Sequence, residues 1–187
     1  EKRKQYIEIV DRKSQRLQNL IEDLFEMSKA TSGNITLNIE DVDIVSLMKQ
    51  TLFELDDKIK ASSLTFKNNF PEEKVVLQLD SQRTFRIFEN IIINATKYAM
   101  ANSRVYLDII EREENVEVIM KNMASEEIDF NPNEIVERFV RGDESRNTEG
   151  SGLGLAIAKS FVELQGGSFK IEVDGDLFKV IMNFKKN

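Results

Sequence analysis

Residues 88–98 read FENIIINATKY, a strongly apolar run that two asparagines interrupt. Asn90, Asn94, Lys97 and Tyr98 follow one another at spacings of four, three and one, so a helix places them along one side. Asparagine is a poor helix former, and it costs desolvation when it is buried without a partner. Either these amides are solvated at the edge of the core, or they form a polar strip facing a ligand. Such a strip could ligate Mg²⁺ through Asn, meet phosphate through Lys and cover a base or ribose with Tyr.

A second run, GSGLGL at residues 150–155, has three glycines at alternate positions just before a predicted helix. Glycine lets the backbone turn tightly and approach a ligand closely. Free amides at a helix N-terminus attract anions such as phosphate. The alternative is a plain flexible junction between a loop and a helix. No parallel β-α-β unit and no Gly-Lys-Ser/Thr accompany the run, so it is neither a Rossmann fingerprint nor a P-loop.

Outward from these two runs, helices alternate with short strands. The patterning predicts helices over about 1–29, 43–61, 80–101 and 153–164, and a short helix ending near Phe139. It predicts an extended piece at 35–39 and strands at 64–70, 75–79, 105–110, 116–120, 169–173 and 178–184. Most strands join as antiparallel pairs. We therefore expect an α+β fold, a two-layer sandwich with helices on one face of a mixed, mostly antiparallel sheet.

The helix over residues 1–29 carries a heptad seam with one lapse, at Lys13. Its apolar positions are Tyr6, Val10, Leu17, Leu20, Leu24 and Met27. This helix either packs on its own domain or pairs with other helices, and the length of the stripe favours pairing. The run Thr31-Ser-Gly-Asn34 is typical of a linker. We therefore expect one unit over residues 1–32 and a second over 33–187.

Composition excludes several classes of chemistry. With 41% hydrophobic and 32% charged residues, the 187-residue chain can bury a core. It contains no cysteine and no histidine, which excludes disulfide scaffolds, thiolate or imidazole metal sites, Ser-His-Asp triads and imidazole general bases. A net charge of -7 weighs against nucleic acid as a partner.

The order of these segments resembles the catalytic ATP-binding domain of sensor histidine kinases. That domain belongs to an ATPase superfamily with gyrase, a heat-shock chaperone and MutL. Residues 90–98 resemble its asparagine box, 135–143 (IVERFVRGD) its phenylalanine box, and 150–155 its second glycine box. The resemblance covers about 35–185, and the helix over 1–29 resembles the second helix of the dimerisation and phosphoacceptor hairpin.

The resemblance implies that Asn94 ligates Mg²⁺, that Lys97 contacts phosphate and that residues 141–151 form a lid over ATP. It implies catalytic roles for Asn90 and Lys97. The implied nucleotide-binding residues are Asn90, Asn94, Lys97, Tyr98, Asn122, Phe139, Arg141, Gly150, Ser151, Gly152, Leu153, Gly154 and Leu155.

Two departures from the family pattern matter, and Asn90 separates two branches of the superfamily. The first glycine box lacks its glycines, and Asn122 stands where the family has an Asp that accepts a hydrogen bond from the adenine amino group. A neutral amide oxygen can still accept that bond, so we expect weaker or altered nucleotide binding. Val136 replaces the first Phe of the phenylalanine box. Asn90 occupies the position of the water-activating Glu of hydrolysing relatives, which favours transfer to a protein over hydrolysis.

The implied function is that of a protein-histidine kinase fragment. It would position Mg-ATP for transfer of the γ-phosphoryl group to a histidine upstream of this chain, and thence to a response regulator. The parent would dimerise through its hairpin, and this part would be the cytoplasmic region of a membrane-anchored sensor. The altered first glycine box motivates an alternative, a degenerate kinase-like module that binds partners without turning over ATP.

Overall fold

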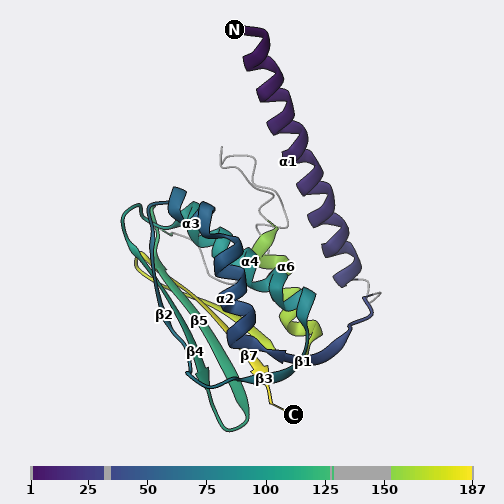
Figure 1. Ribbon diagram of the computed structural model, residues 1–187, viewed down its shortest axis with the longest axis vertical. Coiled ribbons are helices and arrows are strands. Elements are labelled where there is room, and N and C mark those ends of the chain that lie inside the picture. Colours follow the sequence, from purple (N-terminus) through teal and green to yellow (C-terminus); the bar gives the residue numbers. More distant parts are fainter. Residues whose placement is uncertain (1, 32–34, 127, 129–152, 187) are drawn as a thin grey trace.

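The computed structural model describes residues 2–31, 35–126, 128 and 153–186, which form two layers beneath a long first helix (Figure 1). The helices are α1 (Lys2–Thr31), α2 (Ile44–Glu54), α3 (Asp56–Ala61), α4 (Ser81–Tyr98) and α6 (Gly154–Leu164). The strands are β1 (Ile39–Asp43), β2 (Thr65–Asn69), β3 (Val76–Asp80), β4 (Arg104–Glu111), β5 (Asn115–Met123), β6 (Ser168–Asp174) and β7 (Leu177–Lys185).

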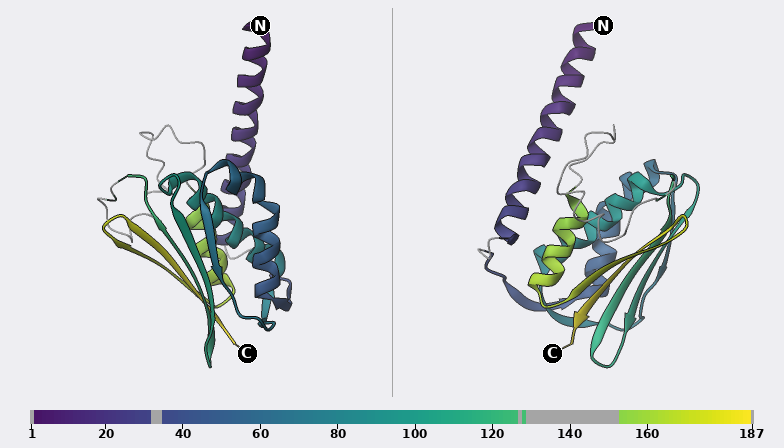
Figure 2. Two further views of the ribbon diagram at one scale, coloured as in Figure 1. Left: turned by 60° about the vertical axis from the view of Figure 1, so that its left-hand side comes forward. Right: turned by 180° about the vertical axis from the view of Figure 1, so that it is seen from behind.

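The main sheet has five strands in the order β2-β4-β5-β7-β6. Strands β2 and β4 are parallel, whereas the other neighbours are antiparallel. Helices α2, α4 and α6 cover one face of this sheet (Figure 2). The alternation along β5 fits this arrangement, because Val116, Val118 and Met120 are fully buried at every second position. The predicted two-layer sandwich with a mixed, mostly antiparallel sheet is confirmed.

Helix α4 lies at the centre of the core. Its residues Phe88, Ile91, Ile92 and Ala95 are fully buried and belong to the main hydrophobic cluster. Burying one large apolar side chain contributes about 1.5–3 kcal/mol, so this face fixes how α4 is rotated against the sheet. The asparagine-bearing side of α4 is turned away from the sheet by the same packing.

Several boundaries differ from the sequence prediction, and three of them show the effect of tertiary structure. The extended piece expected at 35–39 is instead β1 at Ile39–Asp43, because it pairs antiparallel with β3 in a separate two-stranded sheet. The helix expected over 43–61 is divided at Leu55, a buried residue between α2 and α3. The helix expected to reach residue 101 ends at Tyr98, because Ala99 turns extended and bridges to Ala124.

Helix α1 confirms the helix expected over residues 1–29, and its N-terminal half projects away from the sandwich (Figure 1). Val10, Leu17 and Leu24 are each about three-fifths exposed. At the other end, Met27 packs against the core and its sulfur accepts a hydrogen bond from the Ser160 hydroxyl of α6 at 3.8 Å. The two-unit division stays a prediction, because residues 32–34 lie outside the described residues.

Candidate functional site

The β3–α4 junction positions the asparagine-bearing helix. Asp80 ends β3, and its carboxylate accepts a hydrogen bond from the backbone N–H of Arg83 at 2.9 Å, which caps α4. The same carboxylate accepts a second bond from the backbone of Asn38 at 2.9 Å. Asp80 is therefore the N-cap of α4, and it ties the start of this helix to the chain that leads into β1.

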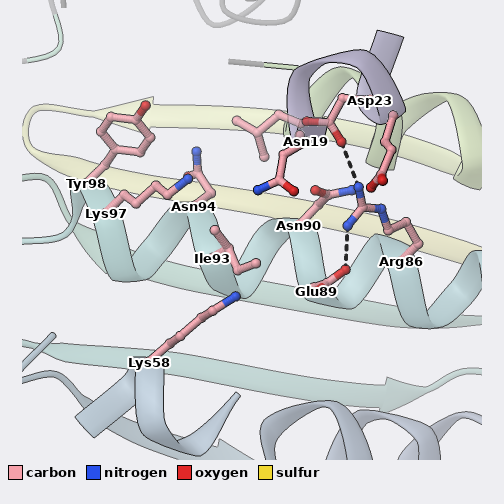
Figure 3. Close-up of a pocket in the computed structure, with 13 residues that line it drawn as sticks. Asn19, Asp23, Lys58, Arg86, Glu89, Asn90, Ile93, Asn94, Lys97 and Tyr98 are labelled. Atoms are coloured by element: carbon pink, nitrogen blue, oxygen red, sulfur yellow. Dashed lines mark hydrogen bonds and ion pairs between the residues drawn. The ribbon is translucent and has the colours of Figure 1, made fainter. Parts of the chain in front are cut away.

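One pocket of about 280 Å³ runs along the outer side of α4 (Figure 3). Asn90, Asn94, Lys97 and Tyr98 all line it, as the spacing of the sequence predicted. The start of α6 lines it too, through Gly154 and Leu155. Folding thus brings the asparagine run and the end of the glycine run, which are far apart in sequence, to one place.

The two runs meet where Gly154 faces Asn90. A Cβ atom placed on Gly154 would lie 3.0 Å from the Asn90 side-chain oxygen, so only glycine fits without displacing that amide. Asn90 itself is 9% exposed, and its Nδ2 is buried without a hydrogen-bond partner. A buried N–H donor without an acceptor costs about 1–3 kcal/mol, which points to an acceptor that a ligand supplies.

Several pocket residues have no counterpart in the sequence prediction. They are Asn19, Glu22 and Asp23 of α1, Lys58 of α3, and Arg86, Glu89 and Ile93 of α4. The sequence could have placed Arg86 on the same side of the helix, because it precedes Asn90 by the same four residues that separate Asn90 from Asn94. The α1 residues carried no local signal, because only tertiary packing brings them to α4.

Arg86 joins α1 to α4 through a cluster of carboxylates. Its guanidinium donates to Asp23 at 2.7 Å, to Glu26 at 3.1 Å and to Glu89 at 2.6 Å. Burial alone lowers the pKa of Arg86, but the hydrogen bond to Glu89 and the charge of Glu26 outweigh burial and raise that pKa above its ordinary value. The permanent positive charge of Arg86 therefore holds α1 against the pocket.

The remaining predicted residues fall into two groups. Asn122 is buried near the end of β5 and is not among the residues that line the pocket. Leu153 directly precedes α6. Phe139, Arg141, Gly150, Ser151 and Gly152 lie outside the described residues, as do the predicted short helix and the lid over 141–151.

The donor set suits a nucleotide-bound Mg²⁺ better than a dedicated metal cage. Across the described ranges, no group of three or more Asp, Glu, His or Cys side chains is arranged to hold a metal ion. Mg²⁺ commonly takes one or two protein oxygens and completes its shell with substrate phosphates and water. The single amide oxygen of Asn94, on the pocket wall beside Lys97, fits that pattern.

Comparison with known proteins identifies the class. Residues 79–186 match the family described as histidine kinase-, DNA gyrase B- and HSP90-like ATPase. The chain therefore belongs to this ATPase family. The sensor protein VanSC of Enterococcus gallinarum is 30% identical over 172 residues, which are 91% of this chain and 47% of that protein. The chain thus spans about half the length of this relative.

Solved structures show the same fold. Full-length ShkA in complex with AMPPNP matches at a TM-score of 0.80 and 18% identity, over 98% of this chain and 39% of that chain. Histidine kinase ThkA in complex with the response regulator protein TrrA matches at 0.77 and 18% identity, over 100% of this chain and 52% of that chain. The family match favours the ATPase interpretation over a partner-binding module without nucleotide chemistry.

Within the described part of the chain, no helix is both long and apolar enough to cross a membrane.

Proposed function

We propose that this domain binds Mg-ATP in the pocket along α4 and positions the γ-phosphoryl group for transfer to a histidine on a phosphoacceptor hairpin. The supporting observation is the meeting of Asn90, Asn94 and Gly154 in one pocket, where the buried Nδ2 of Asn90 has no hydrogen-bond partner. A polyphosphate is rich in acceptor oxygens and would satisfy that donor.

In this proposal each of the side chains along α4 contacts a different part of the nucleotide. Lys97 and the Asn90 amide meet the phosphate oxygens, and Tyr98 covers the ribose or base at the other end. The Asn94 oxygen would hold Mg²⁺, which would neutralise charge on the phosphates. Phosphoryl transfer depends chiefly on positioning and on charge stabilisation, and both can come from such a set.

Asn90 also separates transfer from hydrolysis. Water attack needs a group that accepts a proton, and the neutral amide of Asn90 cannot act as that base. The three carboxylates among the described residues that line the pocket already accept hydrogen bonds: Asp23 and Glu89 from Arg86 at 2.7 and 2.6 Å, and Glu22 from Gln18 at 3.0 Å. We therefore expect slow phosphate release from the isolated domain and faster transfer once a histidine-bearing hairpin is supplied.

The nucleotide site is tested first by binding of a non-hydrolysable ATP analogue in the presence of Mg²⁺. Asn94→Ala removes the proposed metal ligand and should weaken binding by about tenfold or more, which is about 1.4 kcal/mol or more. Asn68→Ala, an exposed position on β2, is the matched control and should bind as the parent does. Saturable binding that is missing in the parent, or that Asn94→Ala leaves unchanged, would exclude this site.

Transfer is tested by adding a separate histidine-bearing hairpin and ATP labelled at the γ-phosphate. We expect label on a histidine, and then on a response regulator receiver domain added afterwards. If the domain binds ATP but labels no histidine on the hairpins of several relatives, the kinase assignment is refuted. The domain would then bind nucleotide without transferring phosphate.

The same proposal includes a homodimer of the parent through its complete hairpin. The apolar positions Val10, Leu17 and Leu24 on α1 are exposed, and they recur at heptad spacing as a helix-pairing seam requires. We also propose a membrane-anchored parent with this region on the cytoplasmic side, where ATP is available. Sedimentation of a chain that carries the full hairpin, and fractionation of cells that express the parent, test these two points.

A further inference from the structure

Lys58 brings a positive charge to the pocket from an element that contributes no other described lining residue. It lies in α3, whereas the other described lining residues belong to α1, α4 and α6. Its side chain is exposed and points from α3 toward α4, with its amine turned toward Ile93 (Figure 3). A ligand that lies along α4 would therefore have the Lys58 amine within reach.

The charge of Lys58 is not used within the described part of the chain. There, no group forms a hydrogen bond or an ion pair with its amine. Lys60, two positions further along α3, is instead paired with Asp56 at 2.5 Å. An apolar neighbour such as Ile93 cannot accept a hydrogen bond from an ammonium group, whereas phosphate oxygens accept it readily. The amine of Lys58 therefore fits an anion in the pocket.

The end of the pocket near Arg86 needs such a cation if it is to hold phosphate. Tyr98 and Arg86 lie at opposite ends of the row of side chains along α4 (Figure 3). Around Arg86, the two arginines Arg83 and Arg86 are paired with three carboxylates, those of Asp23, Glu26 and Glu89. One negative charge is left over, and it repels the terminal phosphate of a nucleotide whose base lies on Tyr98. A positive charge from α3 offsets that repulsion.

We infer that Lys58 contacts the terminal phosphate of the nucleotide and makes the site prefer a triphosphate over a diphosphate. This inference rests on the proposed nucleotide function and deepens it by naming a residue that distinguishes substrate from product. With the base on Tyr98 and the inner phosphates beside Asn94, the terminal phosphate extends toward Asn90, where the Lys58 amine arrives from α3. A diphosphate lacks that group, so the charge of Lys58 stabilises the two bound nucleotides unequally.

The probes are a non-hydrolysable ATP analogue and ADP, because the two differ in the terminal phosphate. Their dissociation constants are measured with Mg²⁺ for the parent and for Lys58→Met, which keeps a long, helix-compatible side chain and removes its charge. We expect Lys58→Met to weaken binding of the ATP analogue by about tenfold or more, and binding of ADP by about threefold or less. Lys58→Arg keeps the charge, so the ratio of its two dissociation constants should stay near that of the parent.

Lys60→Met is the matched control, because it removes the same charge from the same helix at a position that is not among the described lining residues. It should leave the ratio at the parent value. If Lys58→Met keeps the parent's ratio, weakens both nucleotides alike, or changes the ratio no more than Lys60→Met does, the inference is wrong. Thermal melts check that each variant is folded, and Lys58→Gln serves if Lys58→Met is not. A parent that binds neither nucleotide would overturn the proposed function itself.

Discussion

At the scale of single residues, the pocket depends on the close contact between Gly154 and the side chain of Asn90. In Gly154→Ala the new methyl group would lie 3.0 Å from the Asn90 oxygen, so the amide must move by a few tenths of an ångström. Alanine favours the first turn of α6 by up to about 1 kcal/mol, which offsets that strain. We expect an unfolding midpoint close to that of the parent and a clear loss of ATP affinity, measured by thermal melts and by titration calorimetry.

Gly175 is the control for Gly154, because its substitution should lower stability and leave ATP binding unchanged. It sits in the turn between β6 and β7 at a φ of 56°, away from the residues that line the pocket, and a Cβ atom added there would meet no other atom within 4 Å. Gly175→Ala should cost about 1 kcal/mol of stability through backbone strain while ATP binding stays at the parent level. If both variants lose affinity in proportion to stability, the contact between Gly154 and Asn90 has no specific role in the site.

Substitution of Asn122 should affect the stability of the free protein and its affinity for ATP in opposite directions. Replacing a buried, unsatisfied amide by an apolar group of similar size removes a desolvation cost, so Asn122→Leu should leave the free protein as stable as the parent or more stable. The same variant should bind ATP more weakly by about tenfold. Urea unfolding without nucleotide and titration with ATP check the two halves, and a large loss of stability would show that the amide is satisfied in the free protein.

Asp43 connects two elements, because it ends β1 and caps α2. Its carboxylate accepts hydrogen bonds from the Ser46 hydroxyl at 2.5 Å and from the backbone of Val45 at 3.2 Å and Val75 at 3.3 Å. Burial raises the pKa of Asp43, but the bonds from Ser46, Val75 and Val45 outweigh burial and lower that pKa below its ordinary value.

A depressed pKa makes the contribution of Asp43 dependent on pH. The ionised form favours the folded state, so its contribution is complete above the ordinary carboxyl pKa of about 4 and is lost as the pH falls through the lower, native-state value. Asp43→Asn keeps a capping oxygen but does not titrate. We expect the stability difference between parent and variant, from urea unfolding at pH 7 and pH 3, to shrink toward acid. A difference that grows toward acid would contradict the lowered pKa.

Elements whose signals are local could be predicted from the sequence. Helix α4 has its apolar period and Asp80 cap within one segment, and the β4–β5 and β6–β7 hairpins have their turns between adjacent strands. The misplaced element was β1, whose position depends on pairing with β3 and not on its own residues. The site divides in the same way: spacing on α4 identified Asn90 and Asn94, whereas docking of α1 could not be predicted from a heptad pattern.

The whole molecule is tied together where α1 docks on α4 and α6. Arg83 adds to the charged cluster around Arg86, because it lies 3.6 Å from Glu26 and over the ring of Phe161 at 5.1 Å. The side chains of Arg86 and Glu26 are each more than a quarter exposed, so salt screens these pairs in part. Because Glu22 and Asp23 of α1 line the pocket beside Asn90, docking also brings negative charge to the proposed phosphate site.

Glu26→Gln tests how docking and nucleotide binding are coupled, because Glu26 pairs with both arginines but does not line the pocket. We expect weaker docking by about 1 kcal/mol, faster amide hydrogen exchange in the second half of α1 and unchanged exchange in the β5–β7 ladder. Released carboxylates of Glu22 and Asp23 no longer repel phosphate, so ATP affinity should rise, and added salt should reduce the difference from the parent. Asp56→Asn breaks an exposed pair with Lys60 on α3 and should change neither readout. Faster exchange in α1 together with lower ATP affinity would contradict this prediction. It would mean that docked α1 strengthens nucleotide binding and does not weaken it by charge repulsion.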